Sequence, residues 1–107
     1  MSVALTPMDE LAHRVEELIA LLDHAGEPYW KLWMERALVM LDDNRLAGVS
    51  RVLAAYGGED TFSDLVLSPD LADRAPHKFG AQNERLVELR DSIFELANIV
   101  SSGTASL

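Results

Sequence analysis

The amino-acid sequence predicts an all-α fold, a four-helix domain with a long, partly ordered loop between the third and fourth helices. Apolar residues recur at three- and four-residue intervals in four segments, no segment alternates long enough for a sheet, and proline, glycine or capping residues stand at the segment boundaries. We expect one domain over residues 1–107, with a core from about residue 6 to residue 100 and a frayed tail at 101–107. The 49% hydrophobic content can fill one compact core.

The first expected helix follows Thr6, a candidate N-cap, with Pro7 at its first helical position and Asp9 where the acid of a capping box belongs. Gly26 ends it, because glycine accepts the left-handed conformation that often follows a helix. The residues that recur on its apolar face are Met8, Leu11, Val15, Leu18, Ile19 and Leu22. Its opposite, acid-rich face carries Asp9, His13, Glu16, Glu17, Asp23 and His24.

The second expected helix begins at Pro28 and is apolar over most of its circumference. We expect it to be central in the fold, because a helix that is apolar nearly all round is usually buried. Trp30 and Trp33 lie on this helix, and general burial preferences assign both to the core.

The third expected helix is capped by Asp43 or Asn44 and ends at Gly57. The link to the second helix is short, so we expect these two helices to be antiparallel neighbours. Its apolar stripe consists of Leu46, Val49, Val52, Leu53 and Tyr56.

Residues 57–81 show no sustained period, and the last helix is expected over about residues 82–100. Within this long connection, Gly57 is expected to form the C-cap of the third helix and Gly58 a second residue with positive φ. Thr61 and Asp64 have capping-box spacing, so we predict that their side chains clamp the turn that follows. The expected core anchors of the connection are Phe62, Leu65 and Leu67.

Eighteen acidic residues against nine basic ones give a formal charge of −9. This charge disfavours binding to the phosphates of nucleic acid and to an anionic membrane surface, so neither is expected as a partner. It would steer a basic protein partner toward the chain, although a strongly negative charge is also commonly a solubility feature.

The chain has no cysteine, which excludes disulfides, a thiol nucleophile and thiolate metal ligands and favours a cytoplasmic location. The first residues lack a basic segment followed by an apolar stretch, and no apolar run reaches the roughly 18 residues that span a bilayer. We therefore expect neither export nor membrane insertion.

The sequence contains little that is typical of catalytic or metal-binding motifs. Gly57 and Gly58 follow a helix, and no lysine comes after them as in a phosphate-binding loop. His13 and Glu17 could contribute to a zinc site only if another element supplied further ligands. His77 is the one imidazole that shares the long connection with several acids, namely Glu59, Asp60, Asp64, Asp70 and Asp73. A solvated acid cluster explains this composition better than catalysis, and no cofactor is expected.

The stretch YGGEDTFSDLVL resembles the hallmark of a family of small bacterial helical domains of unknown function. In that family a helix ends in a double glycine, followed by a small residue, an aromatic residue or leucine, an Asn-Asp-Leu-like step and an apolar pair. The resemblance covers about residues 28–100 and departs from the pattern at Glu59, Asp60 and Ser63. It implies a helical fold and brings no established reaction or cofactor. The matching residues are Gly57, Gly58, Thr61, Phe62, Asp64, Leu65, Val66 and Leu67.

The leading hypothesis for function is a small, acidic, non-catalytic interaction protein, most concretely an immunity-type protein that binds and neutralises a basic toxin domain. One alternative is a homodimeric structural or regulatory module, with Val87 and Phe94 adding to the apolar surface of the second helix. A further alternative is a metal-dependent enzyme that uses the loop acids and His77. The candidate contacts for a protein partner are Asp9, Glu16, Glu17, Glu59 and Asp60.

Overall fold

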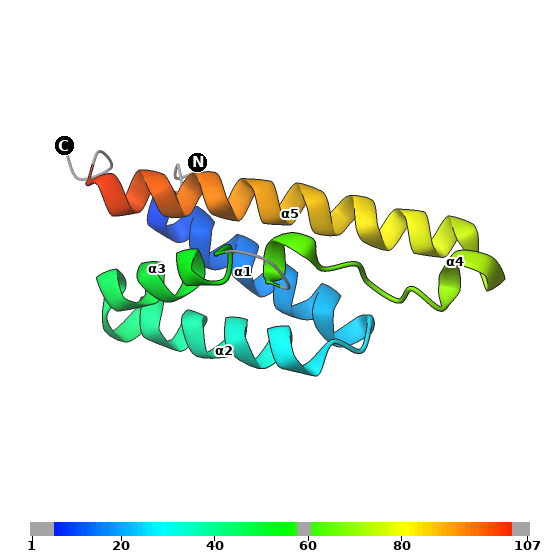
Figure 1. Cartoon of the computed structure of the whole chain (residues 1–107). Helices are drawn as coiled ribbons and strands as arrows, with labels where there is room; N and C mark the ends of the chain where they lie inside the picture. Colours follow the sequence, from blue (N-terminus) through cyan, green and yellow to red (C-terminus); the bar gives the residue numbers. More distant parts are fainter. Residues whose placement is uncertain (1–5, 58–60, 104–107) are drawn as a thin grey trace, which may run out of the picture.

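The computed structural model describes residues 6–57 and 61–103 (Figure 1). Within these ranges the regular structure is helical and includes no strand, which confirms the predicted all-α class. Four long helices are present there, and a short helix that the sequence did not predict precedes the last of them. The elements are α1 (Pro7–His24), α2 (Pro28–Asp43), α3 (Arg45–Ala54), the 3₁₀ turn η1 (Phe62–Asp64), α4 (Leu71–Arg74) and α5 (Pro76–Ser102).

The central helix is α1. Figure 1 shows it between α5 on one side and α2 on the other, and it packs against both, while α3 packs against α2 and α5. The prediction that the second helix is central was wrong, because the side of α2 turned away from α1 faces solvent. On α2, Tyr29, Leu32 and Val39 are 64%, 48% and 69% exposed. Trp30 and Trp33 are only partly buried against the core.

The core is built mainly from α1 and α5, with contributions from α2, α3 and the connection that follows α3. Phe62 and Leu67 of that connection are fully buried, and Leu65 packs against the core from a partly buried position. These three anchors are confirmed. The buried residues of the two main helices are Leu11, Val15, Leu18, Leu22, Leu86, Leu89, Ile93, Ala97 and Val100.

The predicted start of α1 is confirmed in detail. The Asp9 N–H donates to the Thr6 hydroxyl at 3.1 Å, and the Thr6 N–H donates to the Asp9 carboxylate at 3.4 Å, which completes a capping box. Gly26 follows the helix with a φ of 74°, as a left-handed glycine should. The Asn44 side chain caps α3 by accepting from the Ala47 N–H at 3.3 Å.

The end of α3 differs from the prediction. The helix stops at Ala54, and Gly57 is not among the described glycines with positive φ. The N–H groups of Ala55 and Tyr56 instead donate to carbonyls three residues back, and the Ala55 carbonyl accepts from the Phe62 N–H at 3.1 Å. Because tightened backbone hydrogen bonds close the helix, no left-handed glycine is needed at residue 57. The prediction for Gly58 lies outside the described residues.

The turn η1 also forms without the predicted capping hydrogen bond of the Thr61 side chain. Thr61 occupies its N-cap position but makes no capping hydrogen bond through its side chain. The Asp64 N–H, which a capping hydroxyl would accept from, already donates to the Thr61 carbonyl at 3.0 Å. A 3₁₀ turn makes this i to i+3 bond itself, so the capping box that suits an α-helix is not required here.

The last helix is longer than predicted. It begins at Pro76 and continues to Ser102, where Gly103 follows with a φ of 77°. Pro76 and Gly80 were interpreted as loop residues, but proline suits the first position of a helix, and a single glycine is tolerated inside a long one. Residues 101 and 102 therefore belong to α5 instead of a frayed tail, and residues 104–107 lie outside the described ranges.

Two side chains of α5 fasten the connection that leads back from α3. Asn83 pairs with the backbone of Leu67, accepting from its N–H at 2.8 Å and donating to its carbonyl at 3.1 Å. Arg90 donates to the carbonyls of Phe62 and Leu65 at 3.3 and 3.4 Å. The Phe62 carbonyl also accepts from the Leu65 N–H, whereas the contacts with Leu65 and Leu67 satisfy backbone groups outside the regular elements. They hold the connection on the core.

Candidate functional site

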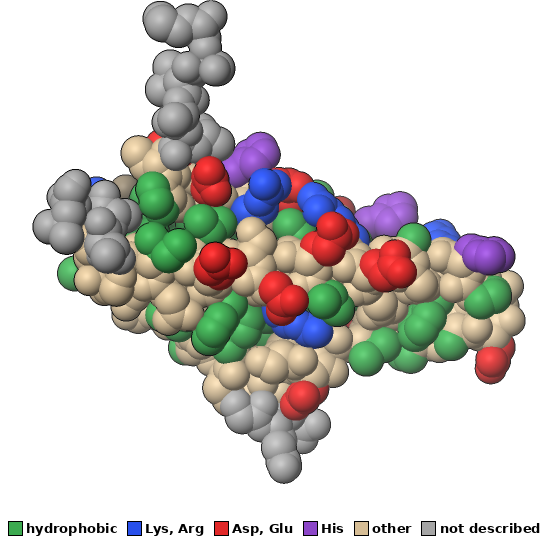
Figure 2. Space-filling view, turned by 90° about the horizontal axis from the view of Figure 1, so that it is seen from above, with side chains coloured by type: hydrophobic (Ala, Val, Ile, Leu, Met, Phe, Trp, Pro, Cys, Tyr) green, Lys and Arg blue, Asp and Glu red, His purple; other side chains and the backbone are tan. Residues whose placement is uncertain are grey.

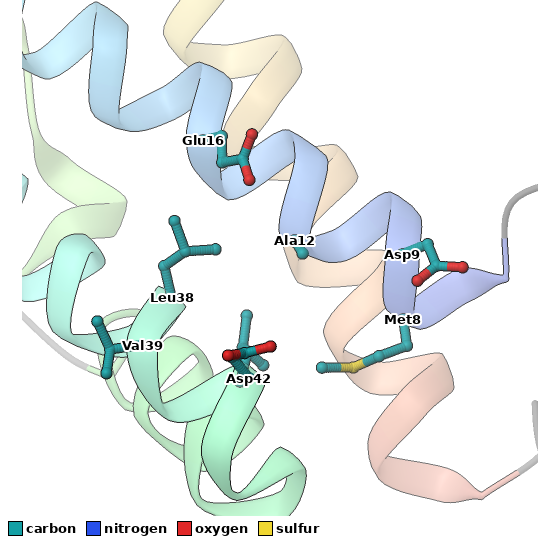
Figure 3. Close-up of a pocket in the computed structure, with 8 residues that line it drawn as sticks. Met8, Asp9, Ala12, Glu16, Leu38, Val39 and Asp42 are labelled. Atoms are coloured by element: carbon teal, nitrogen blue, oxygen red, sulfur yellow. The ribbon is translucent and has the colours of Figure 1, made fainter.

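A depression of about 420 Å³ lies between α1 and α2, near the start of α1 and the end of α2. Figure 3 shows Asp9, Ala12 and Glu16 on α1 across from Leu38, Val39 and Asp42 on α2, with the Met8 side chain reaching between the helices. We call this depression the α1/α2 groove. Its lining is Met8, Asp9, Ala12, Glu16, Leu38, Val39, Leu41 and Asp42.

The groove follows from helical spacing on α1. Asp9, Ala12 and Glu16 are separated by three and four residues, so they share one side of the helix, which is turned toward α2. Ala12 carries only a methyl group at the middle of this side. Because its neighbours on the same side are longer, the surface is hollow where Ala12 lies.

The opposite wall comes from the last two turns of α2. Leu41 is buried and contributes to the floor, Leu38 packs partly against the core, and Val39 stands exposed at the edge. At the other end of the same pair of helices, Lys31 of α2 forms an ion pair with Asp23 of α1 at 2.9 Å. The hydrogen bond with Asp23 raises the pKa of Lys31.

The charge of the groove has one sign. Asp9, Glu16 and Asp42 are exposed carboxylates on its rim, and none of the eight residues that line it is basic. The Asp9 carboxylate also serves the capping box of α1. The groove therefore combines an apolar floor with three negative charges at its edge, an arrangement that suits a ligand with an apolar face and positive flanks.

Asp42 is the rim carboxylate that the sequence did not identify. With Asp43 it occupies the last turn of α2, where the helix dipole favours cations and carboxylates are unfavourable. A residue that is unfavourable for its local structure, and that adds no stabilising contact, often has a function. The unfavourable pair of acids at the end of α2 is the feature of the sequence from which this site residue could have been predicted.

The five predicted partner contacts are not all brought together. Asp9 and Glu16 lie on the rim of the groove. Glu17 is instead engaged within the molecule, where it pairs with Arg14 at 2.6 Å and with Arg85 of α5, and lies 3.4 Å from the His13 imidazole. Its carboxylate thereby links α1 to α5. Glu59 and Asp60 lie outside the described residues.

The acids and the histidine of the long connection do not converge in the described part of the chain. Asp64, Asp70, Asp73 and His77 are all exposed there, and Asp70 pairs with Arg74 at 2.7 Å. Among residues 6–57 and 61–103, no group of three or more His, Asp or Glu side chains is placed to hold a metal ion. The grouping of acids around His77 that the metal-dependent alternative requires is therefore not formed by these described residues.

A second surface lies on α5. Figure 2 looks onto the α5 side of the molecule and shows apolar side chains exposed among acidic and basic ones. Val87 and Phe94 are 44% and 45% exposed, and a seven-residue spacing places them on one side of the helix. The exposed acids of the same helix are Glu84, Glu88, Asp91 and Glu95. This surface is apolar and acidic together, and a depression of about 390 Å³ borders it, lined by Tyr56, Ser63, Arg90, Asp91 and Phe94.

The described residues define an all-helical fold with an acid-rimmed apolar groove. None of its described helices has the length and apolarity to cross a membrane. Residues 23–74, just under half of the chain, match the model of a family described as a domain of unknown function (DUF6966). The match includes residues 57–67, on which the predicted resemblance rests, while most of α1 and all of α5 lie outside it. No curated protein and no solved structure matched the chain.

Proposed function

We propose that the protein is a non-catalytic interaction protein that binds a basic protein partner through the α1/α2 groove. The observation that carries this proposal is the placement of three exposed carboxylates, Asp9, Glu16 and Asp42, around an apolar depression whose lining includes no basic residue. Opposite charge on a partner would speed its encounter with the groove, and apolar contact would hold it there.

The most concrete form of this function is that of an immunity-type protein, which neutralises a toxin domain by covering its site. The formal charge of −9 supports it, because domains that act on nucleic acid carry the basic surface that such a charge attracts. We expect this function in the cytoplasm, which the cysteine-free composition favours.

Affinity capture from the native cell, followed by mass spectrometry, tests the proposal. The parent protein should retain a basic protein, which the purified components then bind with an affinity that falls as salt rises. The double variant Glu16→Lys/Asp42→Lys should lose that protein. Glu84→Lys/Glu88→Lys, which changes the net charge equally on the exposed side of α5, should retain it.

Recovery of the protein alone, under conditions that preserve known complexes, would contradict the proposed function. The immunity form makes a further demand on any captured partner. Its activity on nucleic acid or in a growth assay should fall when the parent protein is added and recover when Glu16→Lys/Asp42→Lys replaces it.

A homodimer is the second candidate, and the exposure of Val87 and Phe94 on α5 favours it. An isologous contact through this surface would, however, bring Glu84, Glu88 and Glu95 near the same acids of the second copy, which is unfavourable. Light scattering over a dilution series separates the two candidates. A monomer at every concentration excludes the dimer, and a dimer that Phe94→Lys dissociates would support it.

A further inference from the structure

We infer that the α1/α2 groove receives about two turns of an amphipathic helix whose apolar stripe is flanked by lysine or arginine. This inference rests on the proposed function and adds to it the secondary structure and the sequence pattern of the segment that binds.

The length of the groove sets the length of the segment. On α1 the rim runs from Asp9 to Glu16, seven residues, which is about 10 Å along a helix axis, or two turns. The wall on α2 runs only from Leu38 to Asp42. A docking helix would therefore place apolar residues at positions i, i+3 or i+4, and i+7 over the floor.

The backbone of the groove favours a helix over an extended segment. Its lining belongs to two α-helices, whose own hydrogen bonds occupy most of their N–H and C=O groups, so the walls offer side chains and no sheet edge. An extended peptide would leave its own N–H and C=O groups unpaired over an apolar floor, which is costly. A helix satisfies those groups internally.

The centre of the groove is shaped for one apolar side chain. Ala12 supplies only a methyl group there, while Met8 and Leu38 form apolar walls beside it. Methionine adapts its shape to different partners, because its side chain is unbranched and flexible. One leucine or phenylalanine of a docking helix can therefore enter above Ala12 and contact both helices.

The charges fix the flanks of the segment. Asp9 and Glu16 are seven residues apart on one wall, so cations two turns apart on the docking helix would meet both. Asp42 faces a third cation from the other wall. The three carboxylates therefore favour a docking helix that carries basic residues on both sides of one apolar stripe.

A second copy of this chain fits the pattern less well. Its α3 helix contains two arginines and no acid, and Leu46 is exposed on it. Arg51 is nevertheless held by Trp33, which leaves Arg45 beside Leu46 as the one cation that α3 can present. One cation cannot match a rim of three carboxylates, so we assign the groove to a different protein.

The test uses a labelled helical peptide of leucine and lysine, about 18 residues long, with leucine at i, i+3, i+4 and i+7 and lysine on both flanks. Fluorescence anisotropy measures its binding to the parent protein, and circular dichroism measures the helicity gained. A peptide of the same composition with the leucines scrambled serves as the matched control. We expect the patterned peptide to bind and become helical, and the scrambled peptide to bind at least tenfold more weakly.

Three protein variants locate the binding. Glu16→Lys/Asp42→Lys should weaken binding of the patterned peptide at least tenfold, and Ala12→Leu should do the same without changing charge, because it fills the centre of the groove. Glu84→Lys/Glu88→Lys should leave the affinity within about twofold. Thermal melts verify folding, and Asp42→Lys should not destabilise α2, because the helix dipole favours a cation in its last turn.

Equal losses from the groove and α5 charge variants would show attraction to net charge and overturn the inference, as would unchanged binding to Ala12→Leu or a bound peptide without helix. The proposed function is tested separately, by capture of a partner from the native cell. If the captured partner no longer binds Glu16→Lys/Asp42→Lys, while the patterned peptide does not bind the parent, the proposed function is supported and the inference of a helical segment is wrong.

Discussion

Trp33 of α2 and Arg51 of α3 each donate a hydrogen bond from the side chain to the backbone carbonyl of the other. The Trp33 Nε1–H donates to the Arg51 carbonyl at 3.1 Å, and the Arg51 Nε–H donates to the Trp33 carbonyl at 3.2 Å. The guanidinium carbon lies 4.2 Å from the centre of the indole ring. The Arg51 carbonyl is one of the last four of α3, which lack partners within the helix, so the pair satisfies a helix end and joins two helices.

This reciprocal pair predicts strong coupling between the two positions. Trp33→Phe and Arg51→Met should each lower the free energy of unfolding by about 1–3 kcal/mol, because each removes a hydrogen bond at a partly buried contact. In a double-mutant cycle the coupling should be about 0.5–3 kcal/mol. Urea denaturation followed by circular dichroism measures it. Strictly additive losses would mean that the two bonds do not depend on each other.

The same substitution at two glycines should have opposite effects. A Cβ atom at buried Gly48 would lie 2.5 and 2.7 Å from the backbone N and Cα of Leu41, so Gly48→Ala must push α3 away from α2 and should cost about 1–3 kcal/mol. A Cβ atom at Gly80 meets nothing within 4 Å, and its φ is not positive. Gly80→Ala should therefore stabilise α5 by about 0.5–1 kcal/mol. In thermal melts, the melting temperature should fall for Gly48→Ala and rise for Gly80→Ala.

Asn83 should be the asparagine of α5 on which stability depends most. Its side chain pairs with both backbone groups of Leu67, and Asn83→Ala would leave a buried residue's N–H and carbonyl without these partners. We expect a loss of about 1–3 kcal/mol. Asn98 is the control, because it is exposed and donates to the Phe94 carbonyl of its own helix. Asn98→Ala should change stability by less than about 0.5 kcal/mol in the same urea titration.

Because Tyr56 is largely buried, we predict that the protein loses stability at alkaline pH. Its hydroxyl donates to the Arg90 carbonyl at 2.8 Å, and burial raises the pKa of Tyr56 well above its ordinary value. An unfolded tyrosine loses its proton near pH 10, whereas the folded protein keeps the proton to higher pH. The unfolded state therefore binds fewer protons above about pH 10, and the free energy of unfolding falls as pH rises.

Urea titrations of the parent and of Tyr56→Phe across this range isolate the tyrosine from Lys31, whose raised pKa acts with the same sign. The variant should lose about 0.5–1.5 kcal/mol near neutral pH and show a shallower decline above about pH 10. In a Tyr29→Phe background, Tyr56 is the remaining tyrosine and its ionisation can be followed by absorbance. Ionisation of Tyr56 near its ordinary pKa would refute the burial argument.

Much of this fold could be predicted from residue spacing and caps. The capping box of Thr6 and Asp9, the cap at Asn44 and the buried stripes of α1 and α5 all depend on neighbours within one helix, which a sequence displays directly. The start of α5 was not predicted, because the residues near it do not favour a helix clearly. Pro76 and Gly80 are ambiguous locally, and α5 reaches back that far while packing against α4, a contact that periodicity does not reveal.

The candidate site was predicted only in part, because a groove is a relation between two helices. Asp9 and Glu16 were identified from the acid-rich face of α1, but Asp42 and Val39 join them only through the way α2 lies beside α1. The contact of Gly48 with Leu41 and the exchange between Trp33 and Arg51 were missed for the same reason. The apolar content of α2 predicted that it would be the central helix, whereas in the structure α1 is central.

The central position of α1 has a consequence for synthesis of the chain. α1 leaves the ribosome before α5, which is one of its two packing partners. At ordinary translation rates, of about 5–20 residues per second, several seconds separate the two. During that time Leu11, Val15, Leu18 and Leu22 lack the cover that α5 provides, so a nascent chain halted before Pro76 should recruit chaperones through α1.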